Sequence, residues 1–225
     1  DKWNDGTFDH VFIAKLVNAR LNDGVGQGKK ENEKDLMPGE PFDSPQKPFV
    51  GDEDYNWSPD SKYVVYVSKT TYGQDYALST NTDIYRYDVE TGKTINITQG
   101  MMGYDINPAY NKKGTLAWLS MKREGFEADK QDLIVMFGSS KINLTANRDD
   151  LQVEGFKWSD DGNKIYFWAP VKATEQLFEI TLGSGNPSAT IRQITKGEFA
   201  LSDILGQSGN TLVAAKTDMN HAPEL

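Results

Sequence analysis

The hydrophobic and polar positions of the chain follow a pattern that recurs at a nearly fixed distance. A short segment ends in an aromatic residue or lies near one, a polar corner follows, and the chain then enters an almost wholly apolar run. The corners centre on Ser61, Gly114, Gly162 and Gly209, at spacings of 53, 48 and 47 residues. Self-similarity at such a period is typical of folds in which each repeat is one supersecondary unit.

In three of the repeats, a segment of alternating apolar and polar residues follows the apolar run at the same position relative to the corner. An apolar run with no polar interruption predicts a strand covered on both faces, whereas alternation predicts a strand that is half exposed. Each repeat is therefore predicted to contain four short strands, with Trp158 as a core aromatic of one first strand. The alternating segments are residues 82–87, 131–135 and 176–180, each followed by turn residues (90–93, 138–140 and 183–185) and a short Ile/Leu-Thr strand.

This pattern predicts an all-β fold, a β-propeller of four-stranded blades of the TolB or WD type. Residues 9–14 and 221–225 are each predicted to be a third strand, and residues 34–38 a fourth strand. We expect an incomplete propeller cut from a larger protein; the alternative is a complete chain that closes as a small propeller with a composite blade. No segment shows helical periodicity, so no helix is predicted. The expected blade portions are about residues 1–50, 51–99, 104–146, 152–196 and 199–225, three full blades and parts of two more.

Composition limits the function classes. Hydrophobic residues make up 37% of the 225 residues and aromatic residues 11%, which is enough for a packed core. The formal net charge of −9 argues against nucleic acid and membrane surfaces as partners, because both favour a basic face. The absence of cysteine excludes disulfides and thiolate metal sites.

The residue patterns of a catalytic or metal centre are missing. No Gly-x-Ser-x-Gly elbow occurs, and residues 206–209 miss its spacing. His10 and His221 are the only histidines and lie near opposite ends of the chain. Residues 147–150 and 160–163 are predicted to be turns, because neither has the length or the terminal Glu of a calcium loop. We therefore predict no catalytic residue, no metal site and no cofactor in this chain.

Three segments break the repeat: residues 24–48, 70–81 and 120–130. The last two join the second and third strands of neighbouring blades, so both are predicted to emerge on the same rim, where recognition usually sits. In the last one, Glu127 can pair with an ammonium group, Arg123 can hold a carbonyl or carboxylate, and Phe126 can cover an apolar side chain. The alternative is a solvated charged loop whose Phe126 tucks into the blade.

Four segments, in order along the chain, resemble one known family. They are Glu-Asp-Tyr-Asn-Trp-Ser-Pro-Asp (53–60), Ser-Thr-Asn-Thr-Asp-Ile-Tyr (79–85), Gly-Tyr-Asp (103–105) and Gly-Phe-Glu-Ala-Asp (125–129). The chain resembles the N-terminal propeller of the prolyl oligopeptidase family, in the branch of dipeptidyl peptidase V and acylaminoacyl peptidase. TolB-type propellers share the Trp-Ser-Pro-Asp corner, whereas the Ser-Thr-Asn-Thr-Asp and Gly-Phe-Glu-Ala-Asp segments are more specific.

The resemblance implies a C-terminal α/β-hydrolase domain with a Ser-Asp-His triad, none of which matches this chain. In this family the propeller covers the active site, admits short peptides and helps to bind their N-terminal end. The resemblance places residues 125–129 opposite the catalytic domain, with Glu127 on the free amino terminus of the substrate and Arg123 and Phe126 in support.

We therefore expect a propeller fragment of a bacterial serine exopeptidase that gates access to the active site and has no activity alone. Its expected partners are short peptides and the hydrolase domain of the same protein. A periplasmic or secreted location is expected, with the cytoplasm left open. One rival is a non-catalytic TolB-like propeller that binds protein partners. A second rival, a lyase acting on acidic sugars, needs clustered histidines and metal ligands, which two remote histidines do not supply.

Overall fold

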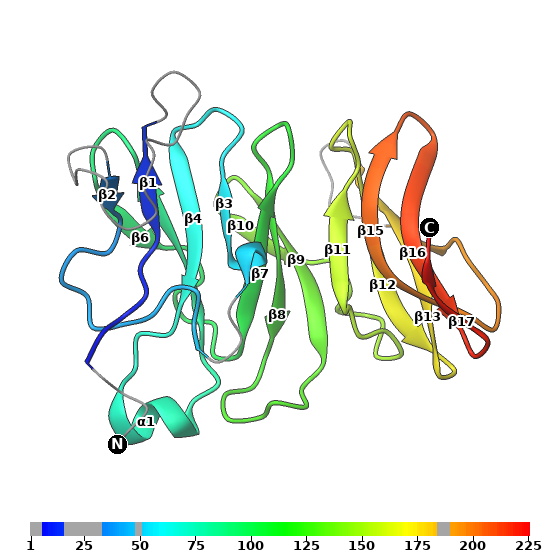
Figure 1. Ribbon diagram of the computed structural model, residues 1–225, viewed down its shortest axis with the longest axis horizontal. Helices are drawn as coiled ribbons and strands as arrows, with labels where there is room; N and C mark the ends of the chain where they lie inside the picture. The colour runs from blue at the N-terminus through cyan, green and yellow to red at the C-terminus, as the bar shows by residue number, and fades with distance from the viewer. Residues whose placement is uncertain (1–5, 16–32, 48–50, 184–189) are drawn as a thin grey trace.

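The strands form five antiparallel sheets that stand side by side in a row (Figure 1). The computed structural model describes residues 6–15, 33–47, 51–183 and 190–225. Within these ranges, three sheets have four strands each, paired in chain order, and the row ends in a two-stranded and a three-stranded sheet. The two end sheets are not paired with each other, so the row is open. The prediction of four-stranded blades in an incomplete propeller is confirmed.

The sheets are numbered here as blades I to V along the chain. As predicted, residues 9–14 supply a strand that pairs with one near residues 34–38, and the last strand lies within residues 221–225. Blade I contains β1 (Phe12–Ala14) and β2 (Glu33–Asp35); blade II contains β3 (Tyr55–Trp57), β4 (Tyr63–Ser68), β5 (Asp83–Asp88) and β6 (Thr94–Asn96); blade III contains β7 (Asp105–Tyr110), β8 (Leu116–Met121), β9 (Gln131–Phe137) and β10 (Ser140–Asn143); blade IV contains β11 (Gly155–Trp158), β12 (Lys164–Val171), β13 (Thr174–Thr181) and β14 (Thr190–Gln193); blade V contains β15 (Ala200–Ser208), β16 (Thr211–Asp218) and β17 (His221–Glu224).

The core lies between the blades. One cluster of buried apolar side chains fills each of the four interfaces between neighbouring blades. The second strands β4, β8 and β12 are the most buried, as their apolar runs predict, and Trp118 and Phe167 are completely inaccessible. Trp158, predicted as a core aromatic, is half-buried at the edge of the cluster between blades III and IV. Side chains from adjacent blades thus hold the row together.

The repeated corner between first and second strands has a defined hydrogen-bond pattern. In blade II, the Ser58 hydroxyl donates to Asp60 at 2.7 Å and accepts the backbone N–H of Tyr63 at 2.9 Å. The corner of blade IV repeats both contacts, so residues 160–163 form a turn as predicted. Ser61 (φ 58°) and Gly162 (φ 67°) occupy the same left-handed position, which explains why the repeat places Ser or Gly there.

The prediction that the chain has no helix is wrong. The loop between β4 and β5 contains the helix α1 (Gly73–Leu78), and a 3₁₀ turn, η2 (Asp52–Asp54), precedes β3. Six residues are too few for a 3.6-residue period to show in the sequence. A tertiary contact stabilises the helix instead: the Lys69 ammonium donates to the carbonyls of Tyr76, at 2.6 Å, and Ser79, and lies over the Tyr76 ring.

Parts of two predicted features lie outside the described residues: residues 24–32 and 48 of the long segment at 24–48, and residues 184–185 of the turn at 183–185. Among the helices that the structure describes, none has the length and apolar character needed to cross a bilayer.

Candidate functional site

Two long loops meet at one rim of blades II and III (Figure 1). One carries α1, and the other joins β8 to β9. The Ser79 hydroxyl donates to the Glu124 carboxylate at 2.9 Å, and the backbone N–H of Gly125 donates to the Thr80 hydroxyl at 2.9 Å. The predicted common rim of these two loops is therefore confirmed, and each loop supports the other.

Within the β8–β9 loop, Arg123 contacts both Asp129 and Phe126. The Arg123 guanidinium donates to one Asp129 oxygen from Nε at 3.0 Å and from Nη2 at 2.8 Å, while the other oxygen accepts two backbone N–H groups. These bonds hold the pKa of Asp129 at about 2. The guanidinium also lies 3.9 Å from the centroid of Phe126, whose ring is 44% exposed rather than tucked into the blade. That Arg123 holds a substrate carbonyl stays a prediction.

Replacing Asp129 with alanine is expected to loosen this loop, because Arg123 and the backbone of Lys122 lose their common acceptor. Amide hydrogen exchange across residues 122–130 should accelerate, while exchange in β12 stays unchanged. Asp149→Ala removes an exposed carboxylate without a described hydrogen bond and serves as the control. Unchanged exchange in the Asp129 variant would show that the loop does not depend on this carboxylate.

Glu127 lies on the wall of a hollow of about 420 Å³ formed by blades II, III and IV. Three other carboxylates, from Glu53, Asp54 and Glu154, line the same hollow. Of the side chains in the described part of the chain, no Lys or Arg lines it. The volume is that of a small-ligand site, and four acidic side chains give it a negative potential.

The first strands of the blades position the carboxylates. Glu53 and Asp54 stand in η2 directly before β3, and Glu154 stands directly before β11. The strand β7 carries a bulge at Asn107, a non-glycine residue at φ 56°, where its pairing with β8 shifts register. The bulge turns the backbone N–H of Asn107 toward Asp54, to which it donates at 3.2 Å. The bulge in β7 thus holds Asp54 in the acidic wall.

Burial raises the pKa of Asp54 to about 6, with a smaller contribution from the charge of Glu53. Because this pKa lies above the unfolded value of 3.8, the native state retains a proton that the unfolded chain releases. The free energy of unfolding should therefore fall as the pH rises from about 4 to about 6 and then level off. In Asp54→Asn this fall should be missing, which urea titrations of both proteins between pH 4 and 8 would measure. Parallel pH profiles would contradict the assignment.

The Glu127 carboxylate is available to a ligand. It is exposed and forms no hydrogen bond or ion pair with any residue that the structure describes. Burial lowers the pKa of Lys69, and the charge of Glu127 partly offsets this effect, so the two groups interact electrostatically. The Lys69 ammonium donates its hydrogen bonds to the carbonyls of Tyr76 and Ser79 beside α1 and not to Glu127. Within the described part of the chain, the Glu127 carboxylate therefore faces the hollow without a direct hydrogen bond or ion pair.

Sequence reasoning identified Glu127 but missed its acidic neighbours. The signal was present in the repeat: Glu53 and Glu154 each stand four residues before the aromatic of a first strand, Trp57 or Trp158. Aligning the repeats on those tryptophans places an acid at the same end of two first strands. Their convergence with Glu127 depends on blade packing, which the sequence pattern does not contain.

The histidines lie elsewhere. His10 contacts Asp35 at 2.8 Å, and His221 contacts Asp218 at the same distance. Among the described residues, no group of three or more His, Asp or Glu side chains is arranged to hold a metal ion.

The fold and the hollow define a β-propeller segment with an acidic ligand-sized site. Solved structures agree on the fold: a TolB protein from Agrobacterium tumefaciens has a TM-score of 0.56 at 17% identity over 75% of this chain and 55% of its own, and oligopeptidase B from Trypanosoma brucei has a TM-score of 0.56 at 12% identity over 88% of this chain and 27% of its own. No protein-family model matches the chain.

Relatives found by sequence indicate the family, whereas the solved structures indicate only the fold. The chain is 40% identical over 205 residues to dipeptidyl-peptidase 5 of Porphyromonas gingivalis, which covers 90% of this chain and 28% of the relative. It is 38% identical over 223 residues to dipeptidyl-peptidase 5 of Porphyromonas endodontalis, which covers 97% of this chain and 30% of the relative. The chain is thus a propeller segment homologous to part of the dipeptidyl-peptidase 5 proteins, and it spans 28% to 30% of their length. The resemblance predicted from the sequence is confirmed.

Proposed function

We propose that this chain is the substrate-capturing propeller part of a dipeptidyl peptidase, and that its acidic hollow binds the free amino terminus of short peptides. An enzyme that removes dipeptides must hold the substrate's α-ammonium group at a fixed distance from the bond it cleaves. The relatives named dipeptidyl-peptidase 5 support the reaction class. The observation that carries the binding role is the unpaired Glu127 carboxylate in a hollow lined by three more acids.

In this proposal the α-ammonium group donates hydrogen bonds to Glu127, and the other carboxylates strengthen the negative potential around it. The contact of Arg123 with Asp129 and Phe126 keeps the loop in one shape, so that Glu127 is held ready before the peptide arrives. A domain outside this chain supplies the catalytic groups. The row of blades limits entry to short peptides.

The proposal is tested by measuring the release of dipeptides by the intact protein from pairs of peptides, one with a free and one with an N-acetylated amino terminus. We expect dipeptides to be released from the free peptides and almost none from the acetylated ones, because acetylation removes the positive charge. Equal cleavage of both members of each pair would overturn the proposed role of the hollow.

The rival function is a non-catalytic propeller that binds protein partners, and the similarity to a TolB structure concerns the fold alone. This rival predicts no release of dipeptides from either kind of peptide. The same assay therefore separates the two functions.

A further inference from the structure

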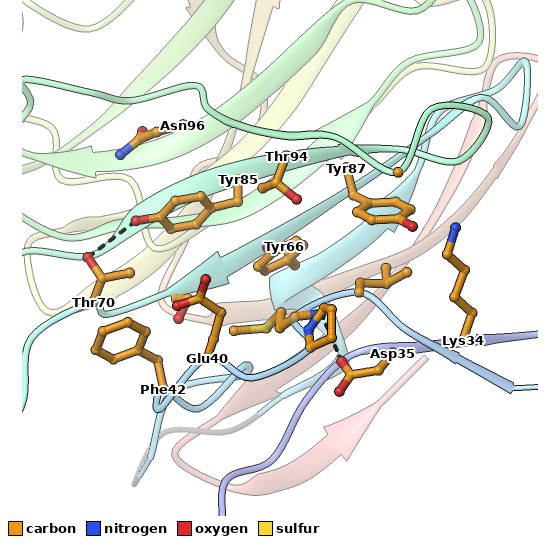
Figure 2. A pocket seen from close by; sticks show the side chains of 15 residues that line it. Lys34, Asp35, Glu40, Phe42, Tyr66, Thr70, Tyr85, Tyr87, Thr94 and Asn96 are labelled. Carbon is orange, nitrogen blue, oxygen red and sulfur yellow. Dashed lines mark hydrogen bonds between the residues drawn. The ribbon is translucent and has the colours of Figure 1, made fainter. Parts of the chain in front are cut away.

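A second groove, of about 500 Å³, opens between blades I and II and shares no lining residue with the acidic hollow (Figure 2). Its wall is aromatic. The rings of Tyr66 and Tyr85 stack with centroids 5.6 Å apart, and Tyr87 and Phe42 extend the wall on either side. Tyr66 and Tyr87 are buried, so these side chains are held in place before any ligand binds.

One end of the groove carries an available negative charge. Figure 2 shows the Glu40 side chain between Phe42 and Tyr66, close to Tyr85. Glu40 is exposed, and within the described part of the chain its carboxylate has no hydrogen bond or ion pair. Burial is the main cause that raises the pKa of Tyr66 and Tyr85, and the charge of Glu40 makes a smaller contribution in the same direction.

The other acidic residue of the groove, Asp35, already has partners within the protein. Asp35 contacts His10 at 2.8 Å and accepts the backbone N–H of Met37 at 2.8 Å. The second ring nitrogen of His10 lies 3.0 Å from the carbonyl oxygen of Glu40. His10 therefore fixes the turn that presents Glu40, and Asp35 does not compete for a ligand.

The opposite end carries a positive charge. The Lys34 ammonium lies 5.2 Å from the centroid of Tyr87 and forms no ion pair with the residues that the structure describes. Figure 2 shows it beyond Tyr87, away from Glu40 along the groove. An aromatic wall with a free carboxylate at one end and a free ammonium at the other is a dipolar site. A ligand with one charge of each sign can pair with both groups at once.

We propose that the groove between blades I and II binds a short peptide with both termini free, its ammonium group at Glu40 and its carboxylate at Lys34. The ammonium group then lies beside the Glu40 carboxylate and the partly exposed ring of Tyr85, an arrangement that favours cations. The peptide's apolar side chain packs on the aromatic wall. The tyrosines supply the apolar contact, and the two charged residues supply orientation.

Calorimetric titration of the intact protein with alanyl-leucine, its N-acetyl form and its C-terminal amide tests the proposal. The free dipeptide should bind most tightly. Glu40→Gln should weaken binding of the free dipeptide by about tenfold, the loss of one charge-assisted contact, and leave the acetylated form unchanged. Lys34→Met should weaken binding of the free dipeptide in the same way and leave the amide unchanged.

Matched controls come from the same blades. Glu33→Gln and Lys93→Met change exposed charges outside the groove and should bind the dipeptide as the unaltered protein does. The free dipeptide can also reach Glu127 in the acidic hollow, so the same titrations are repeated in the Glu127→Gln background, where a failure here is distinct from a failure at the hollow. In that background, affinity for the free dipeptide that Glu40→Gln leaves unchanged, or the absence of any dipeptide binding before Glu40 is replaced, would overturn the proposal. Glu40 and Lys34 are exposed, so thermal melting should show both variants folded.

Discussion

Replacing Trp118 with alanine is expected to lower the free energy of unfolding by about 3–5 kcal/mol, the usual effect of emptying a large aromatic site in a core. Trp118 stands in β8, is completely inaccessible and belongs to the cluster between blades II and III. Its indole N–H donates to the Asp105 carboxylate at 2.9 Å. The other oxygen of Asp105 is buried and accepts no hydrogen bond from the residues that the structure describes, and burial raises the pKa of Asp105 to about 7. The variant therefore loses packing and also leaves Asp105 with one donor fewer.

Urea unfolding of the intact protein measures this effect, and Trp57→Ala provides a control of the same residue type. Trp57 is 49% exposed and has no described hydrogen bond from its ring, so its loss should cost less than about 1 kcal/mol. A loss in the Trp118 variant as small as that expected for the Trp57 variant would contradict a stabilising role for the interface between blades II and III.

For the intact protein, the proposed function predicts that replacing Glu127 with glutamine lowers kcat/KM for peptides with a free amino terminus by roughly 10- to 150-fold. This range corresponds to the loss of one hydrogen bond to a charged group, about 1.5–3 kcal/mol. The change keeps the size of the side chain and removes its charge, so the hollow keeps its shape. The exposure of Glu127 favours the lower part of the range, because water partly screens its charge in the free protein.

Glu90→Gln is the matched control, since Glu90 is an exposed carboxylate in the turn between β5 and β6, outside the hollow. It should leave kcat/KM unchanged. A fall in the Glu127 variant that is equal for free and N-acetylated peptides would point to a general disturbance of the site and away from recognition of the ammonium group.

The repeat made the fold predictable because its local chemistry is strict. Ser61 and Gly162 mark a corner that needs a left-handed residue, and the apolar run ending in Val67 marks a strand covered on both faces. The helix α1 escaped prediction because it depends on a contact from Lys69, a residue outside the helix. Strand patterns thus predict blades well, whereas short elements held by tertiary contacts leave no periodic signal.

The sites were less predictable than the fold. Glu127 stood out because its loop interrupts the repeat, but its acidic neighbours come from other blades and meet it only through packing. In the second groove, Tyr66 and Tyr85 look like ordinary strand aromatics in the sequence. Glu40 lies in a proline-rich segment without a pattern of its own. Interfaces between blades create both sites, and a one-dimensional pattern does not show which faces will meet.

The central claim, that the hollow recognises a free amino terminus through Glu127, is tested most directly by a binding cycle on the intact protein. An uncleavable tripeptide and its N-acetyl form are titrated into the unaltered protein and into Glu127→Gln. The account predicts that the unaltered protein prefers the free tripeptide by about tenfold or more and that this preference disappears in the variant. A preference of the same size in both proteins would contradict it.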